Sequence, residues 1–183
     1  ISGLLCRPQV LVDLLESCLS DGATEPLVEI VLRDAALSAL VVHAASKSGR
    51  GRIDASEPVS SAIQLLGVQV LTGIALLAAK QIVSQDFSPA ALTYLNALWG
   101  ASTFAGLTAR CLAPTVGYLH VEEAQFCALL LNLGMHAQFA SHRDDYVTLA
   151  DGYYSNPRLC WRERKEYRID HLQVAEQLIS PWK

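Results

Sequence analysis

The sequence has few charged residues and no strand-like pattern. Charged residues make up 17% of the 183 residues, and the net charge of −4 argues against a nucleic-acid partner. Hydrophobic residues make up 51%, which excludes a disordered chain. Apolar and polar residues do not alternate between hairpin turns, so we expect an all-α fold, a compact bundle of roughly nine to ten helices.

The sequence also lacks paired cysteine motifs and an N-terminal signal. The five cysteines are scattered, without CxxC spacing, at Cys6, Cys18, Cys111, Cys127 and Cys160. An odd, scattered set is typical of reduced cysteines rather than of a disulfide framework or a zinc finger. No basic segment precedes an apolar core at the N-terminus. These features predict a cytoplasmic protein.

Two uncharged spans, Pro58–Ala79 and Phe87–Ala109, are long enough for membrane helices. Both carry several hydroxyl or amide side chains, and Gly67 interrupts the first span. Buried helices of a globular protein fit this composition better, and we expect no membrane span.

The length fits one domain over residues 1–183, with a helical lobe over 1–86 and a second lobe over 87–183 as the alternative. The chain begins at Ile1 rather than Met. We therefore expect a domain excised from a longer protein, and the sequence does not predict its oligomeric state.

The apolar pattern from Val121 to Ala140 predicts one long helix in the second half of the chain. Its buried face has i, i+3, i+4, i+7 spacing and consists of Phe126, Leu129, Leu130 and Leu133. Asn132 and His136 lie among these residues, four positions apart. A buried amide needs hydrogen-bond partners, since leaving it unpaired costs about 1–3 kcal/mol.

The segment Ala128 to Gly134 resembles the helix of the HD phosphohydrolase superfamily that reads Gly-Leu-Leu-His-Asp-Ile-Gly. The His-Asp doublet is Leu131-Asn132 in this chain. Trp99-Gly100-Ala101-Ser102 is similar to the family's Trp-x-His-Ser, with Ala101 in place of the first metal ligand. Asp170-His171 resembles the later Asp-His segment. The vestigial HD-site positions are therefore Ala101, Leu131, Asn132 and His171.

Two N-terminal motifs indicate the catalytically degenerate HDOD branch of this superfamily. Asp34 to Ser38 resembles its Asp-Pro-Ala-Leu-Thr cap, and Ala62 to Gly67 matches its Ala-Ile-x-x-Leu-Gly signature. Ser46-Lys47 departs from the family's Asn-Ser. The resemblance implies an HD-like bundle across the whole chain. The family usually continues beyond Trp182 with further helices, which we expect this chain to lack.

The resemblance implies a non-catalytic bacterial signal-transduction domain that acts on a protein partner or a neighbouring signalling domain. A metal-dependent phosphohydrolase needs several His and Asp ligands, and His171 alone cannot hold a catalytic cation. We therefore expect no enzymatic activity, catalytic residue, metal or cofactor. Asn132, His136 and His171 form either a vestigial polar pocket or, as the favoured alternative, an ordinary core amide and two hydrogen-bonded histidines.

The most polar segment, residues 158–170, mixes both signs of charge around aromatic rings. Such mixing is typical of an exposed helix with local ion pairs. Exposed arginine and aromatic residues are also enriched at interface hot spots, so we predict a partner or ligand surface here. Its residues are Trp161, Arg162, Arg164, Tyr167 and Arg168. The alternative ligand is a nucleotide or cyclic dinucleotide, which a degenerate sensor would bind.

Overall fold

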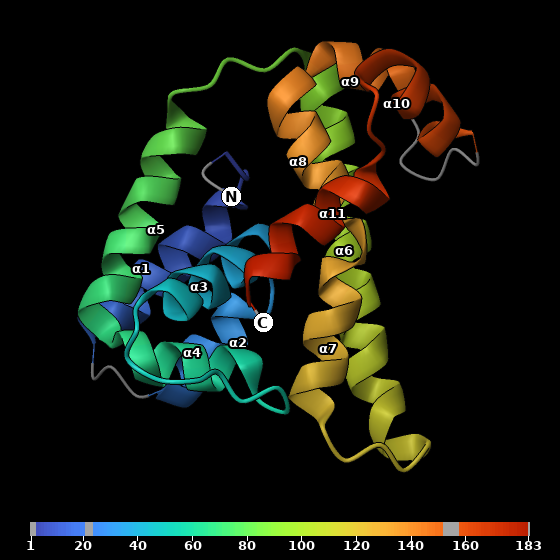
Figure 1. The fold of residues 1–183 in the computed structure, drawn as a ribbon. Coiled ribbons are helices and arrows are strands. Elements are labelled where there is room, and N and C mark those ends of the chain that lie inside the picture. Colours follow the sequence, from blue (N-terminus) through green and yellow to red (C-terminus); the bar gives the residue numbers. More distant parts are fainter. Residues whose placement is uncertain (1–2, 21–23, 152–157, 183) are drawn as a thin grey trace.

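The protein is built from helices, which confirms the expected all-α fold (Figure 1). The computed structural model describes residues 3–20, 24–151 and 158–182, and no strand occurs within these ranges. Eleven α-helices and two 3-10 turns follow one another there: α1 (Pro8–Leu19), α2 (Thr24–Val31), α3 (Ala35–Lys47), α4 (Pro58–Leu66), α5 (Val68–Val83), α6 (Pro89–Thr115), α7 (Val121–Leu129), η1 (Leu130–Asn132), α8 (Leu133–His142), α9 (Asp144–Leu149), α10 (Leu159–Tyr167), α11 (His171–Ile179) and η2 (Ser180–Trp182).

Polar caps and prolines begin several of the helices. The Asp34 carboxylate accepts hydrogen bonds from the backbone N–H of Leu37 at 2.8 Å and of Arg7 at 2.7 Å, so it starts α3 and also fixes the entry to α1. The Ser88 hydroxyl accepts from the N–H of Ala91 at 3.1 Å and starts α6. Prolines occupy the first turns of α1, α4 and α6, where a missing N–H costs little.

The sequence after Ser88-Pro89 predicts a long helix that ends near Leu112, before Ala113-Pro114-Thr115, but α6 continues past that residue. Pro114 lies inside its last turn, and the helix ends at Thr115. The proline removes one hydrogen bond at a point where few remain to be made. The N–H groups of Val116 and Gly117 then close the turn onto the carbonyls of Leu112 and Pro114.

The single helix expected from Val121 to Ala140 is instead two helices, α7 and α8, with η1 between them. Asn132 has φ −100° and ψ 11°, outside the helical region, and it occupies the N-cap position of α8 without a capping hydrogen bond from its side chain. Its side-chain amide approaches the Ser102 hydroxyl at 3.5 Å. Leu131 is 65% exposed. The apolar pattern therefore predicted the helical state but not the break.

The buried residues form two clusters. The larger lies mainly among α1 to α5 and includes Phe126 and Leu133 from the second half of the chain. The smaller lies among α6, α8, α9 and α10, around Tyr94, Phe139 and Tyr146. In Figure 1, α1 to α5 form one side of the molecule, α6 to α10 form the other, and α11 runs between them.

Helix α11 packs on α8 at a position where only glycine fits. A Cβ atom on Gly134 would lie 1.7 Å from the carbonyl oxygen of His171 and 3.1 Å from the backbone nitrogen of Ala175. The first turn of α11 therefore lies directly against the backbone at the start of α8. This contact fixes the position of His171, the first residue of α11, relative to α8.

No single described helix has the length and apolar character needed to cross a membrane. The helices α4 and α5 reach that length only as a pair, and they are bent by 104° relative to each other.

Candidate functional site

The side chains at the four vestigial HD-site positions have different partners. Ala101 is half-buried on α6, and Leu131 is 65% exposed on η1. Asn132 is half-buried and faces Ser102, whereas His171 begins α11 and bonds to α10. In the described part of the chain, no hydrogen bond joins His171 to Asn132 or His136.

Ser102, Asn132 and His136 form a buried polar network between α6 and the start of α8. Nε2 of His136 lies 3.1 Å from the Ser102 hydroxyl, which also faces the Asn132 amide at 3.5 Å. Ser102 and His136 are each 1% exposed. Of the two alternatives for Asn132, His136 and His171, the structure joins the first two through Ser102 and places His171 elsewhere.

Burial keeps this network uncharged. It lowers the pKa of His136 from 6.5 to about 3, and the positive charge of Arg7 lowers that pKa further. The Nδ1 atom of His136 has no hydrogen-bond partner among the described protein atoms. A neutral imidazole, a hydroxyl and an amide offer too little negative charge to hold a hard divalent cation.

His171 belongs to a different cluster, which forms where α10 meets α11. Its Nδ1 atom lies 2.6 Å from Oε2 of Glu163, and its backbone N–H donates to the same oxygen at 3.0 Å. The Tyr146 hydroxyl donates to Oε1 of Glu163 at 2.5 Å. The Glu163 side chain is therefore bound through both oxygens, and it is fully buried.

Cys160 completes this cluster. Its sulfur lies 3.9 Å from each nitrogen of the His171 ring. In the described ranges, Cys160, Glu163 and His171 are the one group whose possible metal ligands all lie within 4.8 Å of one another.

The sequence analysis predicted an exposed helix here and missed the buried Glu163. The available signal was the i, i+4 spacing that places Glu163 on the same face as buried Leu159.

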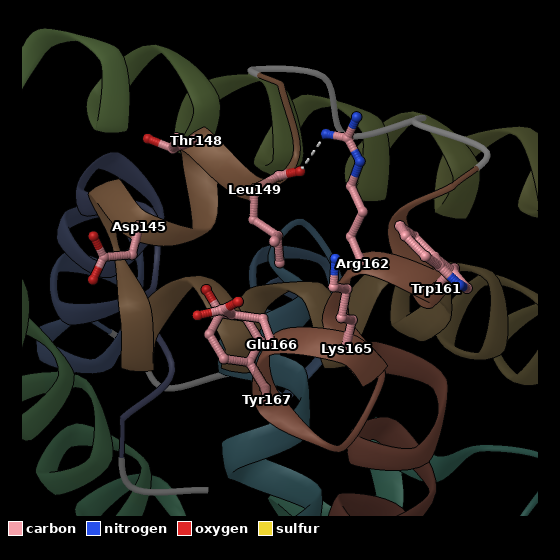
Figure 2. Close-up of a pocket in the computed structure, with 8 residues that line it drawn as sticks. All are labelled: Asp145, Thr148, Leu149, Trp161, Arg162, Lys165, Glu166 and Tyr167. Atoms are coloured by element: carbon pink, nitrogen blue, oxygen red, sulfur yellow. Dashed lines mark hydrogen bonds between the residues drawn. The ribbon is translucent and has the colours of Figure 1, made fainter.

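The predicted surface on α10 forms one wall of an open hollow of about 530 Å³. Figure 2 shows Arg162 extending beside Leu149, whose carbonyl accepts its hydrogen bond at 2.9 Å. Lys165 lies over the Trp161 ring, 5.4 Å from its centroid. The hollow is lined by Asp145, Thr148, Leu149, Trp161, Arg162, Lys165, Glu166 and Tyr167.

The structure separates the five residues predicted for this surface. Trp161, Arg162 and Tyr167 line the hollow, and Trp161 is 62% exposed. Arg164 instead pairs with the buried carboxylate of Asp170 at 2.5 Å, and Arg168 ends α10 with a left-handed φ of 65°. Neither Arg164 nor Arg168 lines the hollow. Arg162 also forms an ion pair with Asp151 at 2.6 Å, so its charge is already partly compensated.

Comparison with known proteins finds one family and a small set of similar structures. The family model described as HDOD domain matches residues 4–183. A fragment of the MmoQ response regulator from Methylococcus capsulatus strain Bath is similar with a TM-score of 0.80 and 20% identity, covering 98% of this chain and 69% of that one. A virulence factor from Campylobacter jejuni subsp. jejuni has a TM-score of 0.71 and 19% identity, covering 98% and 64%. No curated protein matches the chain.

Proposed function

Because the chain belongs to the HDOD domain family, we propose that it is a non-catalytic regulatory domain of bacterial signal transduction. It acts through contacts with a protein partner or with a neighbouring domain of its own chain. One protein of similar structure is a response regulator, which supports a signalling role. Five free cysteines among the described residues support a reducing, cytoplasmic setting.

The observation that carries this proposal is the chemistry at the HD-site positions. Ala101 and Leu131 have no lone pair to offer a cation, and the amide of Asn132 faces Ser102. His171, the remaining position, is bonded to Glu163. Activation of water at phosphorus needs one or two cations held by converging ligands, and these four positions do not provide them.

Exposed apolar side chains support the partner-binding part of the proposal. Phe104 and Leu107, three residues apart on α6, are 74% and 47% exposed, and Leu131 on η1 is 65% exposed. Trp161 on α10 adds an aromatic ring beside charged groups. Large exposed apolar side chains that occur close together are typical of interaction surfaces.

A degenerate nucleotide or cyclic-dinucleotide sensor is the second candidate. The hollow beside α10 favours it, since Trp161 and Tyr167 offer rings for a base while Arg162 and Lys165 offer charges for phosphate. The ion pair between Arg162 and Asp151 opposes it, because a phosphate would have to displace a carboxylate.

Titration calorimetry with a panel of nucleotides and cyclic dinucleotides separates the two candidates. A regulatory module that binds only protein gives flat titrations, and its partner co-purifies with the wild type but is lost on Phe104→Ala or Trp161→Ala. A saturable heat that is lost on Arg162→Ala and kept on Arg52→Ala, a remote exposed arginine, supports the sensor instead.

The proposed absence of phosphohydrolase activity is tested by a separate assay. We expect no turnover of phosphomonoesters or phosphodiesters with added manganese. Turnover that co-purifies with the wild type and disappears in Asn132→Ala and His171→Ala would overturn this part of the proposal. Turnover that survives both substitutions would come from a contaminant and would leave the expectation in place.

A further inference from the structure

Three side chains with metal-binding atoms meet where the first turns of α10 face the start of α11. Cys160 and Glu163 lie three residues apart on α10 and share one side of that helix, and His171 is the first residue of α11. We propose that Cys160, Glu163 and His171 bind a transition-metal ion of the zinc type. The site shares only His171 with the positions that match the HD ligands, because Cys160 and Glu163 lie on α10. It differs from the absence of metal expected from the sequence.

The present distances are close to those of a tetrahedral site. With usual zinc bond lengths, sulfur and nitrogen ligands lie about 3.6 Å apart, and nitrogen and oxygen ligands about 3.3 Å apart. Here the sulfur of Cys160 is 3.9 Å from each ring nitrogen of His171, and Nδ1 of His171 is 2.6 Å from Oε2 of Glu163. Both of these separations have to change by less than about 1 Å, and the sulfur of Cys160 and an oxygen of Glu163 lie within 4.8 Å of each other. Side-chain rotation of Cys160 and His171, both half-buried, can supply such a change.

Surrounding groups already hold the carboxylate and the imidazole in place. The Tyr146 hydroxyl fixes Oε1 of Glu163, and the backbone N–H of His171 fixes Oε2. The Asp170 side chain caps α11 by accepting from the N–H of Gln173 at 2.9 Å, which sets the position of the next residue, His171. Partners that orient metal ligands in this way are a regular feature of metal sites.

The charge balance also favours a cation. The fully buried Glu163 carboxylate lies within 4.8 Å of the Cys160 sulfur, and the Cys160 thiol has one proton to lose. A divalent ion replaces that proton, and it compensates the resulting thiolate and the buried carboxylate together. The sulfur–metal bond forms as the sulfur–hydrogen bond breaks, and the proton goes to solvent. The His171 ring supplies a neutral nitrogen lone pair and gives up its hydrogen bond to Glu163.

Three protein ligands leave the fourth tetrahedral position for water or an outside ligand. A bound ion would fasten α10 to α11 through side chains of both helices. Trp161 follows Cys160 directly, so metal binding would also fix the surface proposed above for a partner. The metal site does not depend on that function, because it rests only on the Cys160, Glu163 and His171 geometry.

Titration of the purified metal-free chain with Co²⁺ tests the proposal, because cobalt bound to thiolate absorbs in the near ultraviolet. We expect one equivalent to bind with a thiolate band. The band should disappear in Cys160→Ser and remain in Cys111→Ser, which alters an exposed cysteine outside the cluster. A wild type without the band, or a band that persists in Cys160→Ser, overturns the proposal.

Alkylation of the wild type gives a second test that does not require a folded variant. Zn²⁺ should slow the labelling of Cys160 by iodoacetamide about tenfold or more, while Cys111 in the same molecule keeps its rate. Peptide mass spectrometry reads both rates from one sample. Equal rates at Cys160 with and without Zn²⁺ would contradict a metal–thiolate bond.

Discussion

His136 and His171 lie on two helices that pack against each other, yet their surroundings differ in charge and access. His136 on α8 is 1% exposed and contacts the neutral Ser102 hydroxyl. The His171 side chain on α11 is 14% exposed and contacts the Glu163 carboxylate, with the Cys160 sulfur beside it. The comparison teaches that, among the described residues, side chains able to ligate a metal ion come together at the α10–α11 junction, and not at the His136 ring near the family motif.

The physical cause of the difference is the number of negative charges near each ring. A buried imidazole without a carboxylate stays neutral, because desolvation makes its protonated form costly. An imidazole beside a carboxylate, as His171 is beside Glu163, can share a cation with that carboxylate. Glu163 lies in the middle of α10 and also accepts from the Tyr146 hydroxyl.

The largest expected effect comes from the contact that holds the two histidine regions together. A methyl group on Gly134 would overlap the carbonyl of His171, which lies 1.7 Å from the Cβ position. Because that neighbour is backbone, α11 would have to move away from α8. We expect Gly134→Ala to lower the free energy of unfolding by about 3 kcal/mol, measured by urea denaturation.

Gly100→Ala is the matched control, because Gly100 also lies in a helix but has nothing within 4 Å of its Cβ position. This substitution should raise the free energy of unfolding by about 0.5–1 kcal/mol through helix propensity alone. If Gly134→Ala were as stable as Gly100→Ala, the close approach of α11 to α8 would be wrong, and with it the placement of His171.

The next effect concerns acid stability and depends on His136. Burial and then the charge of Arg7 lower the pKa of His136 from 6.5 to about 3, so the unfolded chain takes up a proton that the folded chain excludes. The free energy of unfolding therefore decreases as the pH falls below about 6.5, and the loss continues to the folded pKa. Between pH 6.5 and 5 the loss should be on the order of 2 kcal/mol.

His136→Gln should flatten this part of the pH profile, because the amide does not titrate and can still face Ser102. Urea denaturation at several pH values measures the slope. The control is His120→Gln, which alters an exposed histidine and should keep the wild-type profile. A profile that stays steep in His136→Gln would assign the acid sensitivity to other groups.

The sequence alone indicates where α3 and α6 begin, because Asp34 before Ala35 and Ser88-Pro89 are local signals for the start of a helix. The structure confirms the all-α fold because helical periodicity repeats over many residues. The break at Asn132 was not predictable in this way, since it accompanies a tertiary approach to Ser102, thirty residues earlier. The Cys160–Glu163–His171 cluster was missed for a similar reason. Cys160 and Glu163 lie in a mixed-charge segment whose pattern predicts solvent exposure, and His171 follows it directly. Glu163 is buried only through tertiary packing, which the local sequence does not reveal.

The smallest expected effect is at Leu131, which matches the position of the family's histidine ligand. Its side chain is 65% exposed on η1, whereas Leu133, two residues later, is fully buried. Leu131→Ala should therefore change the free energy of unfolding by less than about 0.5 kcal/mol, while Leu133→Ala should cost about 2–5 kcal/mol by leaving a cavity. Urea denaturation of the two variants measures the contrast.

Comparable losses in the two variants would place the Leu131 side chain in the core, next to Ser102 and His136. The central helix would then again be a candidate site where metal ligands could converge. A negligible loss at Leu131 means that a side chain at this position faces solvent, so a histidine introduced there would not by itself restore the lost metal site.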